Sequence, residues 1–305
     1  MAATAKQSGT ILKQTVFDFM GDECPRMAAA LSYYTVFSLP PLLVLVLTLV
    51  GVFVDPQQVQ ELMNSQVGGL IGPQGAAQIQ EIIRSAKRPG GGVTLAAVLG
   101  IAALLFGATA AFAQLQDALN AAWEVKPDPD RGDVKIFLLK RVFSFGMIVG
   151  VGFLLLVSLV ISAALTAVGD MLGRIAPAGV SGVLLQTVNQ AVSFLIIALL
   201  FAAVFKVVPD AVIAWRDVAV GAAFTALLFV IGKFLIGLYL GNSEPGSAYG
   251  AAGSLALILL WIYYSSMILL LGAEFTQVWA EAHGVRIRPA KGAVRVRKEV
   301  EGKPA

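Results

Sequence analysis

Two ionisable residues stand inside long apolar runs of the sequence and are the first candidates for a functional site. Lys233 lies in the run 218–240, and Glu274 lies in the run 252–279. If these runs cross a bilayer, such residues are costly there and usually face the interior of a helix bundle or a wet cavity. The helical rise places Lys233 roughly 10 Å from one membrane surface and Glu274 roughly 8 Å from the other. We therefore expect the two residues to act separately.

Amide side chains occur at a depth similar to that of Lys233. The run 183–208 carries Gln186, Asn189 and Gln190, whose oxygens can accept hydrogen bonds from an ammonium group. This pattern predicts a polar cluster in the outer half of the membrane. The alternative is that Lys233 extends to the outer headgroups while the amides join helices to one another.

A second polar set shares the inner level of Glu274. Its members are Arg26, Ser32, Asn120, Lys206, Asp210 and Arg216. A buried or half-buried salt-bridge network would satisfy all of them without any transport role. The other interpretation is a charge-lined inner vestibule for an anionic headgroup.

The first apolar run contains Pro40 and Pro41, which remove two backbone donors and block carbonyls one turn earlier. We expect a kink or a break there, with Tyr33 and Tyr34 among the polar residues that precede it. Broken helices surround many transported substrates, and a static kink that improves packing is the alternative. Tyr249 lies in a Gly- and Ser-containing loop, 242–250, that permits close helix approach.

Several classes of chemistry are excluded by composition. The chain has one cysteine, Cys24, and one histidine, His283. An intramolecular disulfide is therefore impossible, and a zinc or haem site of ordinary ligand type is not expected. No Gly-rich loop ends in Gly-Lys-Ser/Thr, so the sequence carries no Walker A motif. We expect no enzymatic activity, no catalytic residue, no metal and no cofactor.

The composition indicates a membrane protein. Apolar residues make up 57% of the 305 residues and charged residues 13%, with a mean hydropathy of +0.80. Soluble domains carry about 25% charged residues. The apolar residues form runs long enough to cross about 30 Å as helices. We predict an all-α polytopic membrane domain, 28–280, with about six spans: 28–54, 93–113, 142–168, 183–208, 218–240 and 252–279.

The basic residues predict the orientation. With the N-terminus inside, the inner segments hold 17 of the 22 Lys and Arg residues, the outer segments hold four, and Lys233 lies within a span. Cytoplasmic loops are enriched in Lys and Arg. We expect both termini in the cytoplasm.

Three segments lie outside the predicted spans. In the arm 1–27, Leu12, Val16, Phe19 and Met20 share one helical face, which suits a helix in the inner interface or one packed on the cytoplasmic end of the bundle. Residues 55–92 predict an outer helical cap. The tail 281–305 is basic and should attract anionic lipid headgroups, or else only fix the topology.

The remaining expectations concern repeats and partners. We detect no repeat within the sequence. Gly146, Gly150 and Gly152 leave a homo-oligomer open. The basic tail has no aromatic platform or recognised fold beside it, so we expect no nucleic-acid partner.

Several segments resemble the YihY/BrkB family of bacterial inner-membrane proteins. They are 26–42 (RMAAALSYYTVFSLPPL), 118–123 (ALNAAW), 209–210 (PD), 215–217 (WRD), 221–222 (GA), 232–234 (GKF) with Tyr239, 248–251 (AYGA), 261–266 (WIYYSS) and 272–274 (GAE). The resemblance covers about residues 10–283 and leaves the tail after Gly284 outside.

The resemblance implies a six-span fold in the bacterial inner membrane and a connection with envelope integrity, lipopolysaccharide or lipid export, and serum resistance. Some members carry an old ribonuclease BN label. A nuclease needs clustered ligands or an acid and base in water, and His283 stands alone. We predict a transporter or flippase for a lipid or lipid-linked anionic envelope molecule. The alternative is a membrane scaffold or envelope-assembly factor without catalysis.

Overall fold

The computed structural model describes residues 2–50, 110–128, 180–242 and 252–296. The chain divides into two compact units. Unit 1 comprises Met1–Asp22, Leu119–Lys233 and Ile268–Ala305, and unit 2 comprises Glu23–Ala118 and Phe234–Met267. The predicted outer cap, the run 142–168 and the loop with Tyr249 lie outside the described residues, as does most of the run 93–113.

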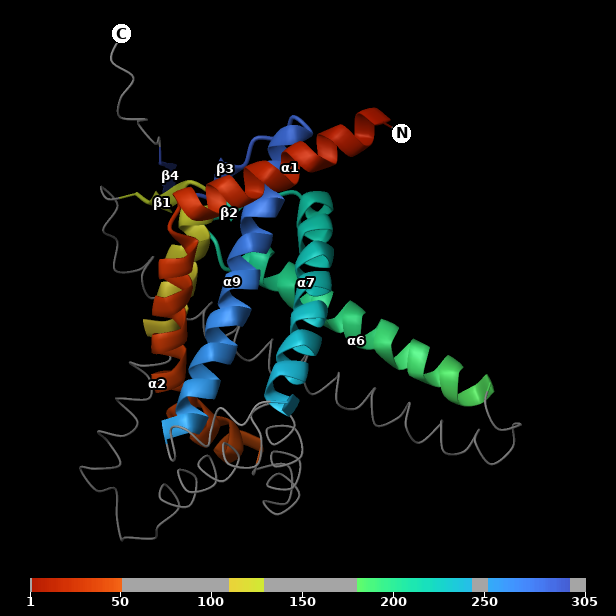
Figure 1. The fold of residues 1–305 in the computed structure, drawn as a ribbon. Coiled ribbons are helices and arrows are strands. Elements are labelled where there is room, and N and C mark those ends of the chain that lie inside the picture. The colour runs from red at the N-terminus through yellow and green to blue at the C-terminus, as the bar shows by residue number, and fades with distance from the viewer. Residues whose placement is uncertain (1, 51–109, 129–179, 243–251, 297–305) are drawn as a thin grey trace, which may run out of the picture. The chain divides into compact units, whose positions relative to one another are not determined.

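Helices dominate the described part of the chain (Figure 1). They are α1 (Ala2–Gly21), α2 (Cys24–Val50), a helix at 110–122, α6 (Val180–Val207), α7 (Trp215–Asn242) and α9 (Ala252–Ala282). The predicted runs 183–208, 218–240 and 252–279 match α6, α7 and α9 to within a few residues. Within these helices, Gln190–Val207, Trp215–Ile236 and Ile258–Ala282 are long and apolar enough to cross a membrane.

Helix α2 contains Pro40 and Pro41 and still runs without interruption from Cys24 to Val50. The expected break is therefore absent from this helix. The ribbon changes direction in its C-terminal part (Figure 1), as expected for a helix that has lost two backbone donors. The proline pair bends the helix and does not end it.

Four short strands complete unit 1, so the expected all-α fold needs a small correction. Strand β1 (Val125–Pro127) pairs antiparallel with β4 (Ala293–Arg295), and β2 (Ala211–Val212) pairs antiparallel with β3 (Arg288–Pro289). The tail after Gly284 thus runs back along two segments, one just after helix 110–122 and one just before α7.

Two glycines direct this return of the chain. Gly284 has a φ of 76°, and the Val285 amide donates to the Ala280 carbonyl at 2.9 Å, which is the bonding of a Schellman turn at the end of α9. Gly292 has a φ of 88° in the turn between β3 and β4. Because L side chains rarely adopt such φ values, glycine suits both turns.

Helix α1 runs obliquely across α7 and α9 at the end of unit 1 that carries the strands (Figure 1). Ile11, Thr15 and Phe19 are buried along one side of it. The described N-terminal and C-terminal segments of unit 1 therefore lie at the same end of these helices. This agrees with one expectation for the arm, a helix packed on the end of the bundle.

Helices α7 and α9 pair antiparallel through two copies of one short motif. The motif is GAAFT at 221–225 in α7 and GAEFT at 272–276 in α9. Our expectation that the sequence has no repeat is therefore wrong at this scale. The two phenylalanines of the motif stack, with Phe224 and Phe275 ring centroids 4.0 Å apart.

Each glycine of the motif faces the threonine of the other copy. A methyl group built on Gly221 would lie 2.8 Å from Thr276 Cβ, and one on Gly272 would lie 2.9 Å from Thr225 Cβ. Both threonines are fully buried, and each hydroxyl donates to the glycine carbonyl of its own helix, at 2.7 Å for Thr225 and 2.6 Å for Thr276. The contact is thus close and leaves neither hydroxyl unsatisfied, as small-residue packing between membrane helices requires.

We predict that Gly221→Ala lowers the free energy of unfolding by about 1–3 kcal/mol, because the added methyl forces the two helices apart. Thermal unfolding of the purified protein in detergent measures this. Gly9→Ala is the matched control, since a methyl at Gly9 meets no atom within 4 Å. The double variant Gly221→Ala/Thr276→Ala should recover part of the loss, and strictly additive effects would contradict the proposed contact.

Candidate functional site

Glu274 is the most deeply buried acidic residue of the described part of the chain, with 0% of its surface exposed. It lies in the stretch Gly272–Gln277 of α9, every residue of which is buried. The equivalent position in the α7 motif is Ala223, which is exposed. Because that copy of the motif packs with alanine at this position, the helix pairing itself does not require a carboxylate there.

Lys233 lies in a different environment. It is exposed on α7, as is Gln190 on α6, and neither forms a hydrogen bond or ion pair with any described residue. The structure does not bring these two together, and the side chains of Gln186 and Asn189 fall outside the described ones. The exposure of Lys233 fits the alternative in which its ammonium extends to the headgroups.

Asn120 and Asp210 are connected by two hydrogen bonds, which we call the Asn120–Asp210 joint. The sequence predicted only that the two residues lie at the same depth in the membrane. Asn120 Nδ2 donates to Asp210 Oδ2 at 3.1 Å, and the Asp210 amide donates to Asn120 Oδ1 at 2.8 Å. The Asp210 carbonyl in turn accepts from the Ala290 amide at 2.8 Å. Since Asn120 is only 3% exposed, these bonds are shielded from water. They join the end of helix 110–122, the loop before β2 and the C-terminal tail.

The other polar residues of the inner set make local contacts. Lys206 donates to the Ile213 carbonyl and lies 5.5 Å from the centroid of the Trp215 ring. Arg26 forms an exposed ion pair with Glu23, and the Ser32 hydroxyl donates to the Ala29 carbonyl at 2.8 Å. Neither Lys206 nor Arg216 forms an ion pair with another described residue. The salt-bridge network and the charge-lined vestibule both stay predictions.

The aromatic residues before the proline pair lie on an exposed side of α2 in unit 2. Tyr33 and Tyr34 are both exposed, with ring centroids 5.7 Å apart in an edge-on arrangement. The Tyr33 ring also lies 4.8 Å from that of Phe37. These rings form an apolar surface with polar tips, which is typical of side chains at a membrane interface.

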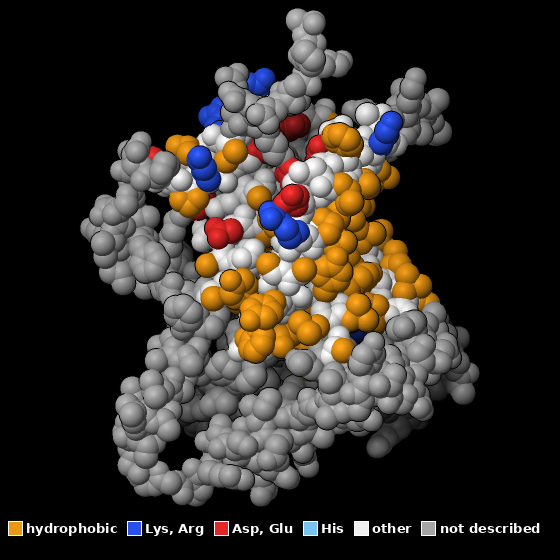
Figure 2. Space-filling view, turned by 60° about the vertical axis from the view of Figure 1, so that its left-hand side comes forward, with side chains coloured by type: hydrophobic (Ala, Val, Ile, Leu, Met, Phe, Trp, Pro, Cys, Tyr) orange, Lys and Arg blue, Asp and Glu red, His pale blue; other side chains and the backbone are white. Residues whose placement is uncertain are grey.

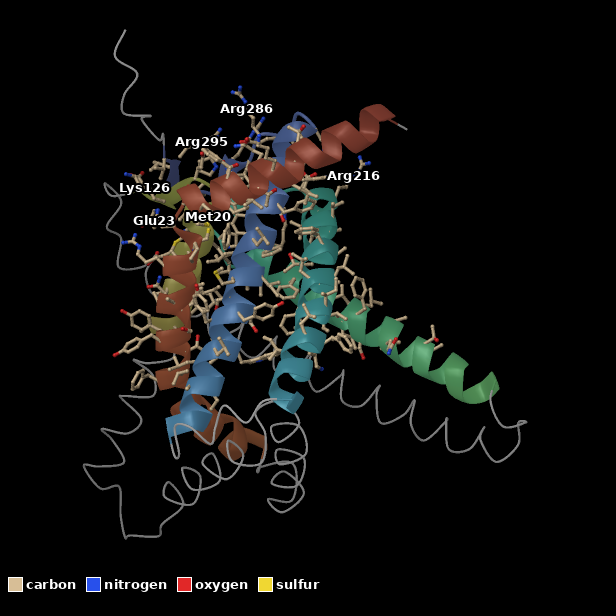
Figure 3. The ribbon with its side chains drawn as sticks, in the orientation of Figure 1. Met20, Glu23, Lys126, Arg216, Arg286 and Arg295 are labelled. Atoms are coloured by element: carbon tan, nitrogen blue, oxygen red, sulfur yellow. The ribbon has the colours of Figure 1, made fainter. Side chains whose placement is uncertain are left out.

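Basic side chains gather at the strand end of unit 1 (Figure 3). Exposed and without an ion pair to any described residue are Lys126, Arg216, Arg286, Arg288 and Lys291. Arg295 differs, because it contacts Glu124 at 3.1 Å and Glu281 at 3.4 Å. The first five side chains therefore leave exposed positive charge at this end of unit 1 that no described acidic residue pairs with.

The sequence analysis did not predict that the tail is folded, although the tail contains a pattern that is typical of strands. Val285, Arg286, Ile287 and Arg288 alternate apolar and basic side chains, a period of two that predicts a strand. In the structure Ile287 is buried and both arginines are exposed. Of these four residues only Arg288 lies in a strand, and Val285 is 40% exposed, so the alternation matches the structure only in part.

We predict that Asn120→Ala lowers the free energy of unfolding by about 1–3 kcal/mol, because it leaves the buried partners on Asp210 unsatisfied. Gln14→Ala is the control, since the Gln14–Asp18 hydrogen bond of 2.8 Å is exposed. Thermal unfolding compares the two variants. Equal stability of both would show that the joint contributes nothing measurable.

The long apolar helices, the buried carboxylate and the polar contacts at one end together define a helical membrane protein. A sequence profile of the family described as virulence factor BrkB matches residues 15–297, and the chain belongs to this family. The predicted resemblance is thus confirmed. The expectation that it stops before the tail is wrong, because the profile extends through β4.

The relatives found by sequence comparison are also named membrane proteins. The chain is 30% identical over 258 residues to a UPF0761 membrane protein of Azotobacter vinelandii, covering 84% of this chain and 60% of the relative. It is 30% identical over 275 residues to one of Alkalilimnicola ehrlichii, covering 89% and 58%. A UPF0761 membrane protein of Pseudomonas aeruginosa is 28% identical over 258 residues, covering 84% and 59%. The chain spans about three-fifths of the length of these relatives. No solved structure matches it.

Proposed function

We propose that this protein moves a lipid or lipid-linked anionic envelope molecule across or within the bacterial inner membrane, as a transporter or flippase. The observation that carries the proposal is the burial of Glu274 in α9, a helix able to span the membrane. A carboxylate in that setting is costly and usually belongs to a substrate or ion path. The α7 copy of the motif has Ala223 at this position and still packs. The contact between the helices therefore does not require the buried carboxylate.

The basic side chains support an anionic substrate. Lys126, Arg216 and Arg286 are exposed at the end of unit 1 where α7 begins and α9 ends (Figure 3). Phosphate and carboxylate groups are preferred partners of arginine. A headgroup arriving at this surface would therefore meet uncompensated positive charge before reaching the apolar helices.

The same charges support the topology of six spans with both termini in the cytoplasm. Cytoplasmic segments are rich in Lys and Arg, and the strand end of unit 1 carries most of the described basic residues of that unit. Helix α1 and the folded tail both lie at this end. It is therefore the cytoplasmic end in our proposal, and the N- and C-termini lie on one side.

A scaffold or envelope-assembly role is the second candidate, and the folded tail is the observation that favours it. Arg286 precedes β3, Arg288 lies in β3 and Lys291 lies in the turn before β4, and all three are exposed. An ordered basic face of this kind suits docking of an acidic partner. In neither candidate does the protein act as an enzyme, and nothing in either role calls for a nucleic acid.

We predict that Glu274→Gln slows transbilayer movement of labelled phosphatidylglycerol in proteoliposomes by about tenfold or more, equivalent to about 1.4 kcal/mol. Gln keeps the size and removes the charge, so packing is disturbed little. Glu281→Gln is the matched control, because Glu281 lies on the same helix, is exposed and pairs with Arg295 at the surface. Unchanged movement with Glu274→Gln at equal incorporation would refute the assignment of this residue.

Changes in the C-terminal tail distinguish the transport role from the scaffold role. We expect the triple change of Arg286, Arg288 and Lys291 to Gln to preserve thermal stability, because all three side chains are exposed. A scaffold role requires this variant to lose complementation of an envelope defect and requires the wild type to move no labelled phosphatidylglycerol in proteoliposomes. Because Arg286 also belongs to the surface proposed for the substrate, loss of complementation together with lipid movement by the wild type would support transport instead. Truncation after His283 should in addition lower the melting temperature, because it removes β3 and β4, whereas truncation after Val296 keeps both strands and serves as the control.

A further inference from the structure

Helix α1 has an apolar side that is exposed in the described part of the chain. Its buried side consists of Ile11, Thr15 and Phe19, spaced four residues apart. A second row, Leu12, Val16 and Met20, has the same spacing and is exposed, with Met20 at 62%. Phe17, at 72% exposed, extends this outer row. We call Leu12, Val16, Phe17 and Met20 the outer stripe.

Gln14 and Asp18 occupy the remaining side of α1, whereas Lys13 falls within the arc of the outer stripe, between Met20 and Phe17. Gln14 and Asp18 are joined by a hydrogen bond of 2.8 Å along one exposed edge. At about 100° of rotation per residue, the buried row and the outer stripe together cover well over half of the circumference. A helix that only packs on the end of a soluble bundle has one apolar side. The outer stripe therefore calls for a second apolar neighbour.

The position of α1 places the outer stripe near a membrane surface. The helix runs obliquely across α7 and α9 where the former begins and the latter ends (Figure 1), and both helices are able to span a bilayer. Figure 2 shows hydrophobic side chains and charged side chains of both signs on the face that it draws. Within unit 1, the apolar residues of α7 and α9 give way to charged residues where α7 begins and α9 ends, as at a membrane interface.

Charge near the stripe favours an anionic surface. Lys13 comes directly after Leu12 and is exposed, and Arg216 and Arg286 lie at the same end of unit 1 (Figure 3). None of the three forms an ion pair with a described residue. Lys13 lies within the outer stripe, and the long stem of a lysine can pack along apolar surface while its ammonium reaches the phosphate groups.

We propose that α1 lies in the headgroup layer of an anionic bilayer, with Ile11, Thr15 and Phe19 on the protein and the outer stripe in lipid. The occupant of the outer stripe is thus the membrane itself, and the helix joins unit 1 to the bilayer surface. This role concerns the lipids around the protein and does not depend on transport of any substrate. A second copy of the chain is the competing occupant, and spin labelling distinguishes the two.

The single cysteine makes the labelling direct. Cys24 is fully buried, so Cys24→Ala provides a background for one new cysteine at a time on the full chain. Phe17→Cys and Met20→Cys place a nitroxide label on the outer stripe, and Gln14→Cys places it on the polar edge as the matched control. The protein is reconstituted in nanodiscs, which hold one copy, of phosphatidylcholine alone or mixed with phosphatidylglycerol. Collision with oxygen, which concentrates in lipid, and with a water-soluble nickel chelate reports the depth of each label.

We expect labels at positions 17 and 20 to collide several-fold more with oxygen than with the nickel chelate, and the label at 14 to show the reverse. Equal exposure of all three labels to the chelate would overturn the proposal. Dipolar broadening between labels at position 20 in liposomes, together with chelate access in single-copy nanodiscs, would assign the stripe to a second copy and also overturn it.

A separate experiment tests whether anionic lipid favours the immersed position of α1. Each basic residue near an anionic surface changes the equilibrium between immersed and withdrawn α1 by about fivefold. Lys13→Gln should therefore reduce the immersed fraction in nanodiscs with phosphatidylglycerol and leave it unchanged in phosphatidylcholine alone. The same immersed fraction for wild type and Lys13→Gln in both lipids would refute the contribution of charge.

Discussion

The contact between the two glycine–threonine pairs of α7 and α9 is the constraint on which much of the described structure depends. In a bilayer, lipid tails are as apolar as leucine, so burial of apolar surface does not by itself drive helices together. Gly221 and Gly272 let the backbones approach, and Thr225 and Thr276 fill the space left by the missing side chains. Each hydroxyl is bonded within its own helix, so the contact buries no unsatisfied donor.

The position of α9 then determines the path of the C-terminal tail. The helix ends in a turn at Gly284 that sends the chain back, and the tail pairs with the segments after helix 110–122 and before α7. Near a membrane these segments need partners for their backbone groups. The tail supplies them, and the Asn120–Asp210 joint closes the same region through side chains. The packing of two spans and the order of the tail are therefore linked through one turn.

The charged and apolar surfaces of unit 1 result from this arrangement. The folded tail exposes arginines that a disordered tail would present without fixed geometry, and α1 lies at the same end with apolar residues on two of its sides. Both features lie at the same end of the helices of unit 1. Glu274 lies within the α9 half of the repeated motif, where the α7 half has alanine, so the local symmetry is broken by a single carboxylate.

The sequence by itself determined the membrane class, the family and the extents of α6, α7 and α9, because long apolar runs and their flanking charges are local properties of the chain. It also indicated that Asn120 and Asp210 lie at one level. Tertiary structure alone decided that these two residues bond, that Lys206 turns to the Ile213 carbonyl and that the tail is ordered. These contacts join residues far apart in sequence or depend on direction around a helix, and neither composition nor spacing specifies such geometry. The repeated motif at 221–225 and 272–276 is visible in the sequence. Only the structure shows that the glycine of each copy contacts the threonine of the other.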